Sequence, residues 1–148
     1  MDGRPLIARA ADLSSIAAAA RIYERSGRAA FAWRPPDHFK AKDFIGFARD
    51  EEVTAAMLDG AIAGVATLYR PLGFLHCLFV DPPCQGRGVG RALVDHVRAL
   101  AGGPLTLKVD APNAAAIAFY QRMGAVPLDG PDDSGIEDAV AWRRWRIG

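Results

Sequence analysis

The chain has 148 residues, of which 51% are hydrophobic and 24% are charged, and its formal net charge is +1. This length is enough for one domain with a sizeable core, residues 1–148, and too short for a second autonomous domain. The composition excludes a disordered or low-complexity chain. Because acidic and basic residues nearly balance, we expect neither nucleic acid nor an anionic membrane as a partner.

Targeting signals and metal motifs are not evident in the sequence. The N-terminal segment has no basic region followed by an apolar run, and no apolar stretch reaches the roughly 20 residues of a membrane span. Cys77 and Cys84 have neither a CxxC partner nor histidines at zinc spacing, so we expect packing residues and not a disulfide framework or a metal site. We therefore expect a cytoplasmic protein without a bound metal.

The first half of the chain predicts one strand, two helices and an antiparallel meander. Apolar runs separated by Asp59-Gly60 are typical of a β-hairpin, and helical spacing of apolar residues follows the capping residue Asp12. The expected elements are a strand over 6–10, a helix from Asp12 to Gly27, a short helix beginning at Asp37, and strands over 53–58, 62–69 and 74–80.

The second half alternates helices with strands. Its expected elements are a helix from Val89 to the Gly102-Gly103-Pro104 stop, a strand over 105–109, a helix over 113–123, a short strand near Val126, and a final strand over 139–147. The order βααβββαβαβ predicts an α/β fold with a mixed sheet that carries helices on its faces.

A glycine-rich turn between a strand and a helix predicts an anion site. In VDPPCQGRGVGRAL, residues 80–93, the backbone N–H groups from Gln85 to Gly90 stand at the start of the helix, where the helix dipole places about half a positive charge. Arg87 and Arg91 add two full charges. A tight turn that needs glycine only for its backbone is the alternative, and the clustered arginines argue against it.

The spacing of the glycines reduces the number of phosphate-bearing ligand classes that the loop could bind. Gly86, Gly88 and Gly90 form GxGxG, which differs from the GxGxxG of dinucleotide-binding folds. The loop also lacks the Gly-Lys-Ser/Thr that nucleoside triphosphate hydrolysis requires. Neither class is therefore supported.

The segment QGRGVG resembles the Q/R-x-x-G-x-G/A loop of the GNAT (Gcn5-related) N-acetyltransferases, and HCLFVDPP, RALVDHV and APNAAAIAFYQRMGAV resemble the same family in order and spacing. The resemblance implies a GNAT-like fold with two splayed central strands and acetyl-CoA as cofactor. Segments 24–50 and 129–138 match nothing particular. The cofactor-binding residues that the resemblance implies are Leu78, Phe79, Val80, Gln85, Gly86, Arg87, Gly88, Val89, Gly90, Arg91, Asn113 and Tyr120.

Two of these residues can also be interpreted from the sequence without the family resemblance. Asn113 follows Pro112 and is expected to cap the next helix. Spacing alone makes Tyr120 a core residue, whereas the resemblance implies a catalytic hydroxyl facing the sulfur of CoA. Proton transfer from a phenol of pKa about 10 to a thiolate whose acid has a pKa of about 8.5 is uphill by about 2 kcal/mol. A hydrogen bond to the sulfur therefore describes that role better than acid catalysis.

Acetyl transfer to an amine also requires a neutral amine. A lysine-like amine is neutral in roughly one molecule in 2,500 at pH 7, a handicap of about 4.6 kcal/mol that a base or desolvation must offset. His76 is the candidate catalytic base, and strand alternation puts it on the side of Leu78 and Val80. It resembles a histidine of the arylalkylamine N-acetyltransferases in the same superfamily. A histidine that only fills a strand position is the alternative.

The sequence leaves the amine acceptor open. A primary amine of a small molecule is the first expectation, and the alternatives are a protein lysine or N-terminus, or a non-catalytic acyl-CoA sensor. Five acidic residues in 129–138 suggest either attraction of a cationic acceptor or a solvated loop. An open acidic groove would favour peptides or polyamines. A closed aromatic pocket of Phe31, Trp33, Phe39 and Phe44 would favour a small or aryl amine. A homodimer is possible but has no sequence marker.

Overall fold

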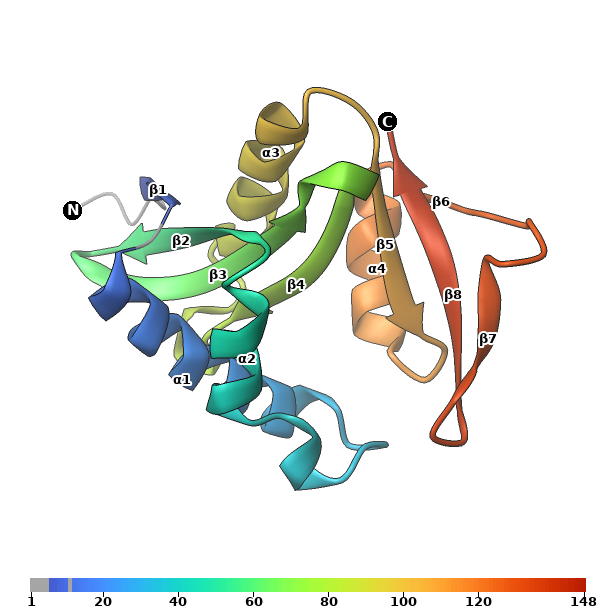
Figure 1. The fold of residues 1–148 in the computed structure, drawn as a ribbon, viewed down its shortest axis with the longest axis horizontal. Coiled ribbons are helices and arrows are strands. Elements are labelled where there is room, and N and C mark those ends of the chain that lie inside the picture. Colours follow the sequence, from blue (N-terminus) through green and yellow to red (C-terminus); the bar gives the residue numbers. More distant parts are fainter. Residues whose placement is uncertain (1–5, 11) are drawn as a thin grey trace.

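The computed structural model describes residues 6–10 and 12–148, with the side chains of 6–10 and of Leu13 outside the description. The expectations that rest on residues 1–5 and on the Leu13 side chain thus lie outside the described residues. The helices and strands are β1 Leu6–Ala10, α1 Leu13–Ala30, α2 Ala41–Phe47, β2 Glu52–Leu58, β3 Ala61–Tyr69, β4 Phe74–Val80, α3 Val89–Ala101, β5 Leu105–Asp110, α4 Ala114–Arg122, β6 Val126–Pro127, β7 Ser134–Glu137 and β8 Val140–Ile147 (Figure 1).

These strands form one mixed sheet in the order β1-β2-β3-β4-β5-β8-β6, and β7 pairs with β8 as well. β4 and β5 run parallel and share a single register pair, Phe74 with Thr106, where both strands begin. Beyond that pair they separate toward their C-terminal ends, and Figure 1 shows the gap between them. The predicted splayed central strands and the mixed α/β fold are confirmed.

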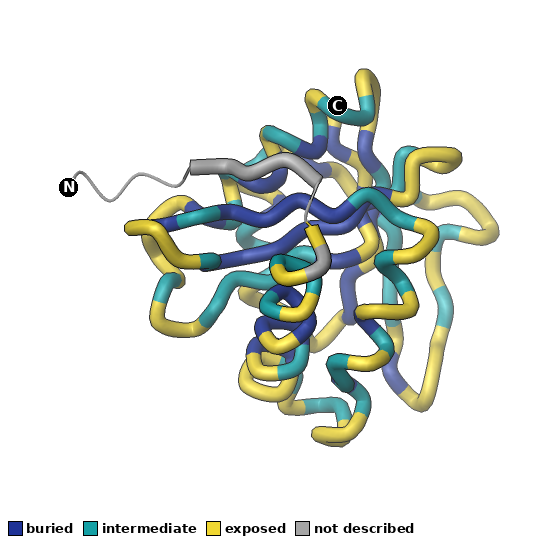
Figure 2. The backbone as a smooth tube through the Cα atoms, turned by 60° about the vertical axis from the view of Figure 1, so that its left-hand side comes forward, coloured by how far each residue is buried: buried dark blue, intermediate teal, exposed yellow. Residues whose placement is uncertain are grey.

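Helices cover both faces of the sheet, and each face has its own core. α1 and α2 pack Ile22 and Phe44 against Val65 of β3. On the other face, α3 packs Leu93 and Val97 in a second cluster that includes residues of α4, β5 and β8. The central strands between these layers are buried along most of their length (Figure 2). The alternation of apolar residues along β3 thus supplies both cores at once.

The structure differs from the expected elements in two helices. α1 continues past Gly27 to Ala30, because this glycine is used for close packing and not as a helix end. A Cβ atom at Gly27 would lie 2.3 Å from the Phe39 ring. Asp37 belongs to a 3-10 turn over Pro36–His38, and α2 begins only at Ala41.

The stretch 129–138 holds a strand, β7, that the sequence did not predict. It pairs antiparallel with β8, and two of the five acidic residues in the stretch pair with basic side chains of the chain. Glu137 accepts a hydrogen bond of 2.7 Å from Lys108, and Asp129 pairs with Arg143. These two carboxylates are therefore partly neutralised by residues of β5 and β8, which weakens the alternative that the stretch attracts a cationic acceptor.

A buried ion pair connects the loop between α1 and α2 to the end of β5. Arg34 donates two hydrogen bonds, of 2.8 and 3.0 Å, to the carboxylate of Asp110, and the indole of Trp33 donates a third of 3.0 Å. The side chains of Arg34 and Asp110 are only 6% and 9% exposed. Because α1 packs on β3 and β4, this contact, which we call the loop clamp, spans the gap between β4 and β5.

The same contact decides the charge of Asp110. Burial by itself would raise the pKa of this carboxyl, but the hydrogen bonds from Arg34 and Trp33 outweigh burial and hold the pKa below 3.8. Asp110 is therefore an anion in the folded chain throughout the neutral range.

Gly27→Ala is expected to destabilise the fold by about 1–3 kcal/mol, because the added methyl group overlaps the Phe39 ring. Gly46→Ala is the matched control, since Gly46 lies in α2 and a Cβ there would meet nothing within 4 Å. The control should gain up to about 1 kcal/mol from helix propensity. Urea unfolding followed by circular dichroism measures both, and equal midpoints would contradict the packing role of Gly27.

Asp110→Asn is expected to cost about 3 kcal/mol of unfolding free energy at pH 7, because it leaves the Arg34 charge buried without a counter-ion. Glu52→Gln breaks the exposed Glu52–Arg70 pair and should cost at most about 1 kcal/mol. The penalty of Asp110→Asn should shrink as the pH falls below 3.8, since protonation then removes the same charge from the wild type. A penalty independent of pH would show that the ion pair is not its source.

Candidate active site

A groove of about 1500 Å³ occupies the gap between β4 and β5. Its walls come from β4, the turn before α3, α4, the end of β5 and the loop between α1 and α2. The structure brings nearly all of the predicted site residues together here: His76, Leu78, Phe79, Val80, Gln85, Gly86, Gly88, Val89, Gly90, Arg91, Asn113 and Tyr120 all line the groove. Arg87 is the exception, since its side chain turns outward to Asp59 at 3.4 Å.

The turn before α3 presents a row of free backbone donors. The first hydrogen bond at the start of the helix runs from the N–H of Ala92 to the carbonyl of Gly88. Among the described residues, no backbone N–H from Gly86 to Arg91 has a backbone acceptor. Gly88 has φ +81° at the N-cap and provides no side-chain cap. This left-handed conformation favours glycine and leaves the donors without a backbone partner. The predicted row was wrong at Gln85, because its N–H donates a hydrogen bond of 3.3 Å to the carbonyl of Pro82 at the end of the preceding 3-10 turn.

Helix α4 forms the opposite wall and begins as predicted. The side chain of Asn113 accepts a hydrogen bond of 3.1 Å from the N–H of Ala116, which confirms its role as N-cap. Gly90 has a packing reason besides its place in the loop, because a Cβ there would lie 3.3 Å from the Phe119 ring. The absence of a side chain at Gly90 thus lets the first turn of α3 approach α4.

Tyr120 is buried on α4 and lines the groove. Burial, and after it the nearby Cys77 side chain, raises the pKa of its phenol above the ordinary value of 10. Proton donation to a thiolate is therefore even less favourable than at the ordinary pKa. No described residue is hydrogen-bonded to the hydroxyl, which leaves it available as a donor to a ligand in the groove.

The position of His76 differs from the expectation based on strand alternation. Thr67 pairs with Cys77 while the adjacent Leu68 pairs with Leu75, so His76 is the extra residue of a β-bulge in β4. Its ring packs against Phe47 of α2, with ring centroids 4.6 Å apart. Leu78 and Val80 pack instead in the core beneath α3 and α4. The predicted shared face is wrong, because the bulge re-aims His76 toward α2.

Sequence reasoning missed the partner of His76. The imidazole Nδ1 lies 2.9 and 2.8 Å from the two carboxylate oxygens of Glu51. Glu51 precedes β2 and is 25 positions away in the chain, and no local motif connects the two residues. The partners in the loop clamp were likewise not predicted.

Aromatic rings and mixed charges form the wall that faces α1 and α2. Phe31 and Phe39 line the groove as expected, whereas Phe44 lies in the core and Trp33 is engaged with Asp110. The alternative of a closed pocket built from all four of these aromatic residues is therefore not formed. Other lining residues on this side are Phe47, Phe74, Lys42, Asp43, Lys108 and Glu137.

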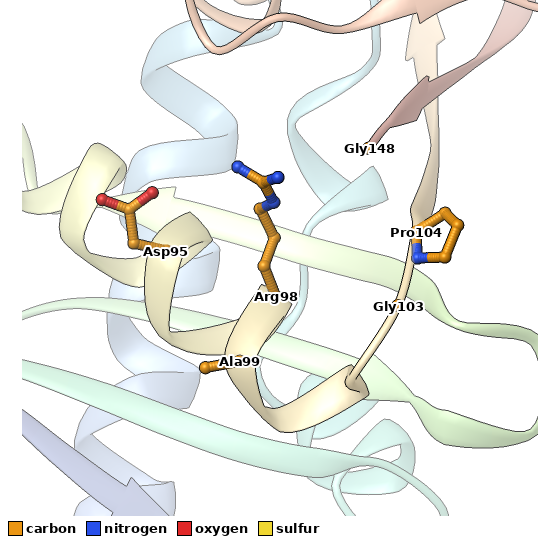
Figure 3. A pocket seen from close by; sticks show the side chains of 6 residues that line it. All are labelled: Asp95, Arg98, Ala99, Gly103, Pro104 and Gly148. Carbon is orange, nitrogen blue, oxygen red and sulfur yellow. The ribbon is translucent and has the colours of Figure 1, made fainter.

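A second, smaller hollow lies at the other end of α3. Asp95 and Arg98 extend from the helix toward it, and Pro104 and the C-terminal Gly148 border it (Figure 3). It contains none of the predicted site residues.

Within the described part of the chain, no helix has the length and apolar character that a membrane crossing requires.

Comparisons with known proteins agree with this geometry. A peptidyl-lysine N-acetyltransferase YjaB of Salmonella typhimurium is 37% identical over 83 residues, which are 50% of this chain and 57% of that protein. A mycothiol acetyltransferase of Acidothermus cellulolyticus is 34% identical over 106 residues, 63% of this chain and 31% of that protein. The matched segments thus span less than two thirds of these relatives' own lengths.

The fold has a close counterpart among solved structures. The PaiA N-acetyltransferase of Thermoplasma acidophilum, crystallised in complex with coenzyme A, superposes with a TM-score of 0.76 at 13% identity, covering 97% of this chain and 98% of that one. The model of the acetyltransferase (GNAT) family matches residues 16–125, which include β4, the donor-rich turn, α3, β5 and α4. The chain therefore belongs to the GNAT family of acetyltransferases.

Proposed function

We propose that this chain is an acetyl-CoA-dependent N-acetyltransferase that moves the acetyl group directly to a primary amine in a ternary complex. The observation that carries the proposal is the row of free N–H groups from Gly86 to Arg91, which opens into the same groove as Tyr120 and His76. An anion-binding turn, a hydrogen-bond donor and a basic side chain are the groups that this reaction needs.

Different parts of the groove would bind the different parts of acetyl-CoA. The turn before α3, together with Arg91, would bind the pyrophosphate through N–H groups and charge. The edge of β4 that faces β5 has no strand partner beyond Phe74 and would bind the pantetheine arm. Gln85 supports this turn by donating a hydrogen bond of 3.2 Å to the carbonyl of Val80.

Direct transfer requires no covalent enzyme intermediate. Acetyl-CoA supplies a thioester, whose carbonyl carbon is attacked by the amine nitrogen while the carbon–sulfur bond breaks. Tyr120 would donate a hydrogen bond to the departing sulfur, and His76 would accept the proton that the amine releases. Both side chains line the groove but come from opposite walls, α4 and β4.

A small primary amine is the acceptor that we propose first, because the rings of Phe47 and Phe74 pack against His76 and all three residues line the groove. A peptide lysine is the second candidate. The groove is large and carries both signs of charge on its outer wall, and one relative is named as a peptidyl-lysine acetyltransferase. Release of CoA should therefore be measured with small primary amines and with lysine peptides in parallel.

Gly88→Ala is expected to weaken acetyl-CoA binding about tenfold or more, because a side chain at φ +81° strains the turn and displaces its N–H donors. Gly102→Ala is the matched control, since Gly102 has φ +68° at the other end of the same helix. It carries a similar backbone strain far from the turn, so its affinity should stay within about twofold. Isothermal calorimetry with acetyl-CoA measures both. An equal loss of affinity would refute the proposed role of the turn.

Tyr120→Phe is expected to lower kcat about 10- to 100-fold with acetyl-CoA affinity nearly unchanged, because the hydroxyl would act on sulfur only as the thiolate departs. Tyr69→Phe, at an exposed tyrosine outside the groove, is the control and should keep full activity. Equal losses of kcat and affinity would contradict the role of Tyr120. Binding of acetyl-CoA without turnover of any amine would instead indicate a sensor.

A further inference from the structure

We propose that Glu51 is a positioning residue that, through His76, forms a proton-accepting dyad facing the amine acceptor. The proposal rests on the acetyltransferase function proposed above and adds a residue that no motif of the sequence indicated. Glu51 itself does not line the groove, whereas His76 does. Any effect of Glu51 on the reaction therefore passes through the imidazole.

The hydrogen bond between the two residues fixes which nitrogen faces the acceptor. An ionised carboxylate only accepts hydrogen bonds, so Nδ1 of His76 carries the proton that both Glu51 oxygens share at 2.9 and 2.8 Å. In the neutral imidazole, the remaining nitrogen, Nε2, is then free to take a proton. This is the arrangement by which a carboxylate sets the tautomer of a catalytic histidine.

Two aromatic rings hold the imidazole in this orientation. Phe47 of α2 meets it edge-on at 4.6 Å between centroids, and Phe74 of β4 stacks on it at 5.8 Å with an interplanar angle of 24°. The side chain of Glu51 is only 10% exposed, while that of His76 is 34% exposed. The carboxylate is thus sheltered and the imidazole is accessible. This is what the proposal requires, because the imidazole must reach the acceptor in the groove while the carboxylate holds it from behind.

The charged surroundings of His76 favour a strong base. Hydrogen bonding to the adjacent Cys77 side chain and to Glu51 raises the pKa of His76 to about 10, against the opposing effect of burial. From α2, the ring of Phe47 contacts it, and Lys42 and Asp43 of the same helix line the groove. Below that pKa both ring nitrogens carry protons, so His76 can accept a proton only in the fraction of molecules whose imidazole is neutral, and transfer should become faster as the pH rises toward about 10.

Protons and bonds balance over the step. The amine nitrogen forms a bond to the acetyl carbon, the carbon–sulfur electron pair leaves with the thiolate of CoA, and the proton lost by nitrogen passes to Nε2 of His76. The imidazolium that results is held by Glu51. Because the two residues are this close, they titrate as one unit, and the pH dependence of transfer belongs to the pair.

The test compares Glu51→Gln with Glu52→Gln. The second variant changes the neighbouring glutamate, which pairs with Arg70 and does not touch His76. The chain has three histidines, so ¹⁵N NMR can follow the His76 imidazole directly, with its signals assigned by their loss in His76→Asn. Steady-state acetyl transfer to the best amine is measured for each variant from pH 6 to a pH above the wild-type pKa of His76, so that the plateau of kcat is reached.

In Glu51→Gln, the pKa of His76 should fall below about 10, while the contribution of the Cys77 side chain remains. The pH at which kcat levels off should fall with it, and kcat on the plateau should drop at least about tenfold. Glu52→Gln should leave all three unchanged. A merely structural role of Glu51 would lower activity without moving the titration.

Three outcomes would overturn the inference. An unmoved His76 titration in Glu51→Gln, with transfer intact in the wild type, would exclude the pair and leave the acetyltransferase function standing. A shifted titration with unchanged kcat and pH profile would exclude its part in catalysis. The third outcome is that the His76 titration shifts in Glu51→Gln as expected, but the wild-type chain binds acetyl-CoA and acetylates no amine. This would overturn the proposed function itself, and the catalytic role of the pair with it.

Discussion

The separation of β4 from β5 is the constraint on which the rest of this structure depends. Two parallel strands normally share a continuous ladder, and here the ladder ends after one pair, Phe74 with Thr106. The strand edges exposed by this separation carry polar backbone groups that need partners. A groove between them is consequently a place where an extended ligand can complete the sheet, and the donor-rich turn before α3 stands at its end.

A gap in the middle of a sheet weakens the connection between its two halves, and the chain compensates on both faces. On one face, α3 and α4 share a core that reaches from β2 to β8, with Gly90 allowing their close contact near the groove. On the other, the loop clamp ties the segment after α1 to the end of β5. An ion pair that is almost fully buried is costly unless every hydrogen bond is made, and Trp33 supplies the third.

The same architecture separates the chemical tasks of the groove. Tyr120 is buried and weakly acidic, which suits a hydrogen-bond donor, whereas His76 is accessible and strongly basic, which suits a proton acceptor. Burial on α4 raises the pKa of Tyr120, whereas hydrogen bonding to the Cys77 side chain and to the sheltered Glu51 carboxylate raises the pKa of His76. The β-bulge contributes to this difference, because without it His76 would point to the opposite face of the sheet.

The sequence by itself determined the features that depend on neighbours in the chain. The donor-rich turn, the Asn113 cap and the order of helices and strands each follow from a few consecutive residues, whose backbone preferences act locally. Only the tertiary structure decided that Glu51 meets His76 across 25 positions, that Arg34 meets Asp110 across 76, and that β7 joins β8. The physical reason is that side-chain partners at such separations are chosen by packing and by a bulge that reverses strand parity, and neither leaves a periodic signal in the sequence.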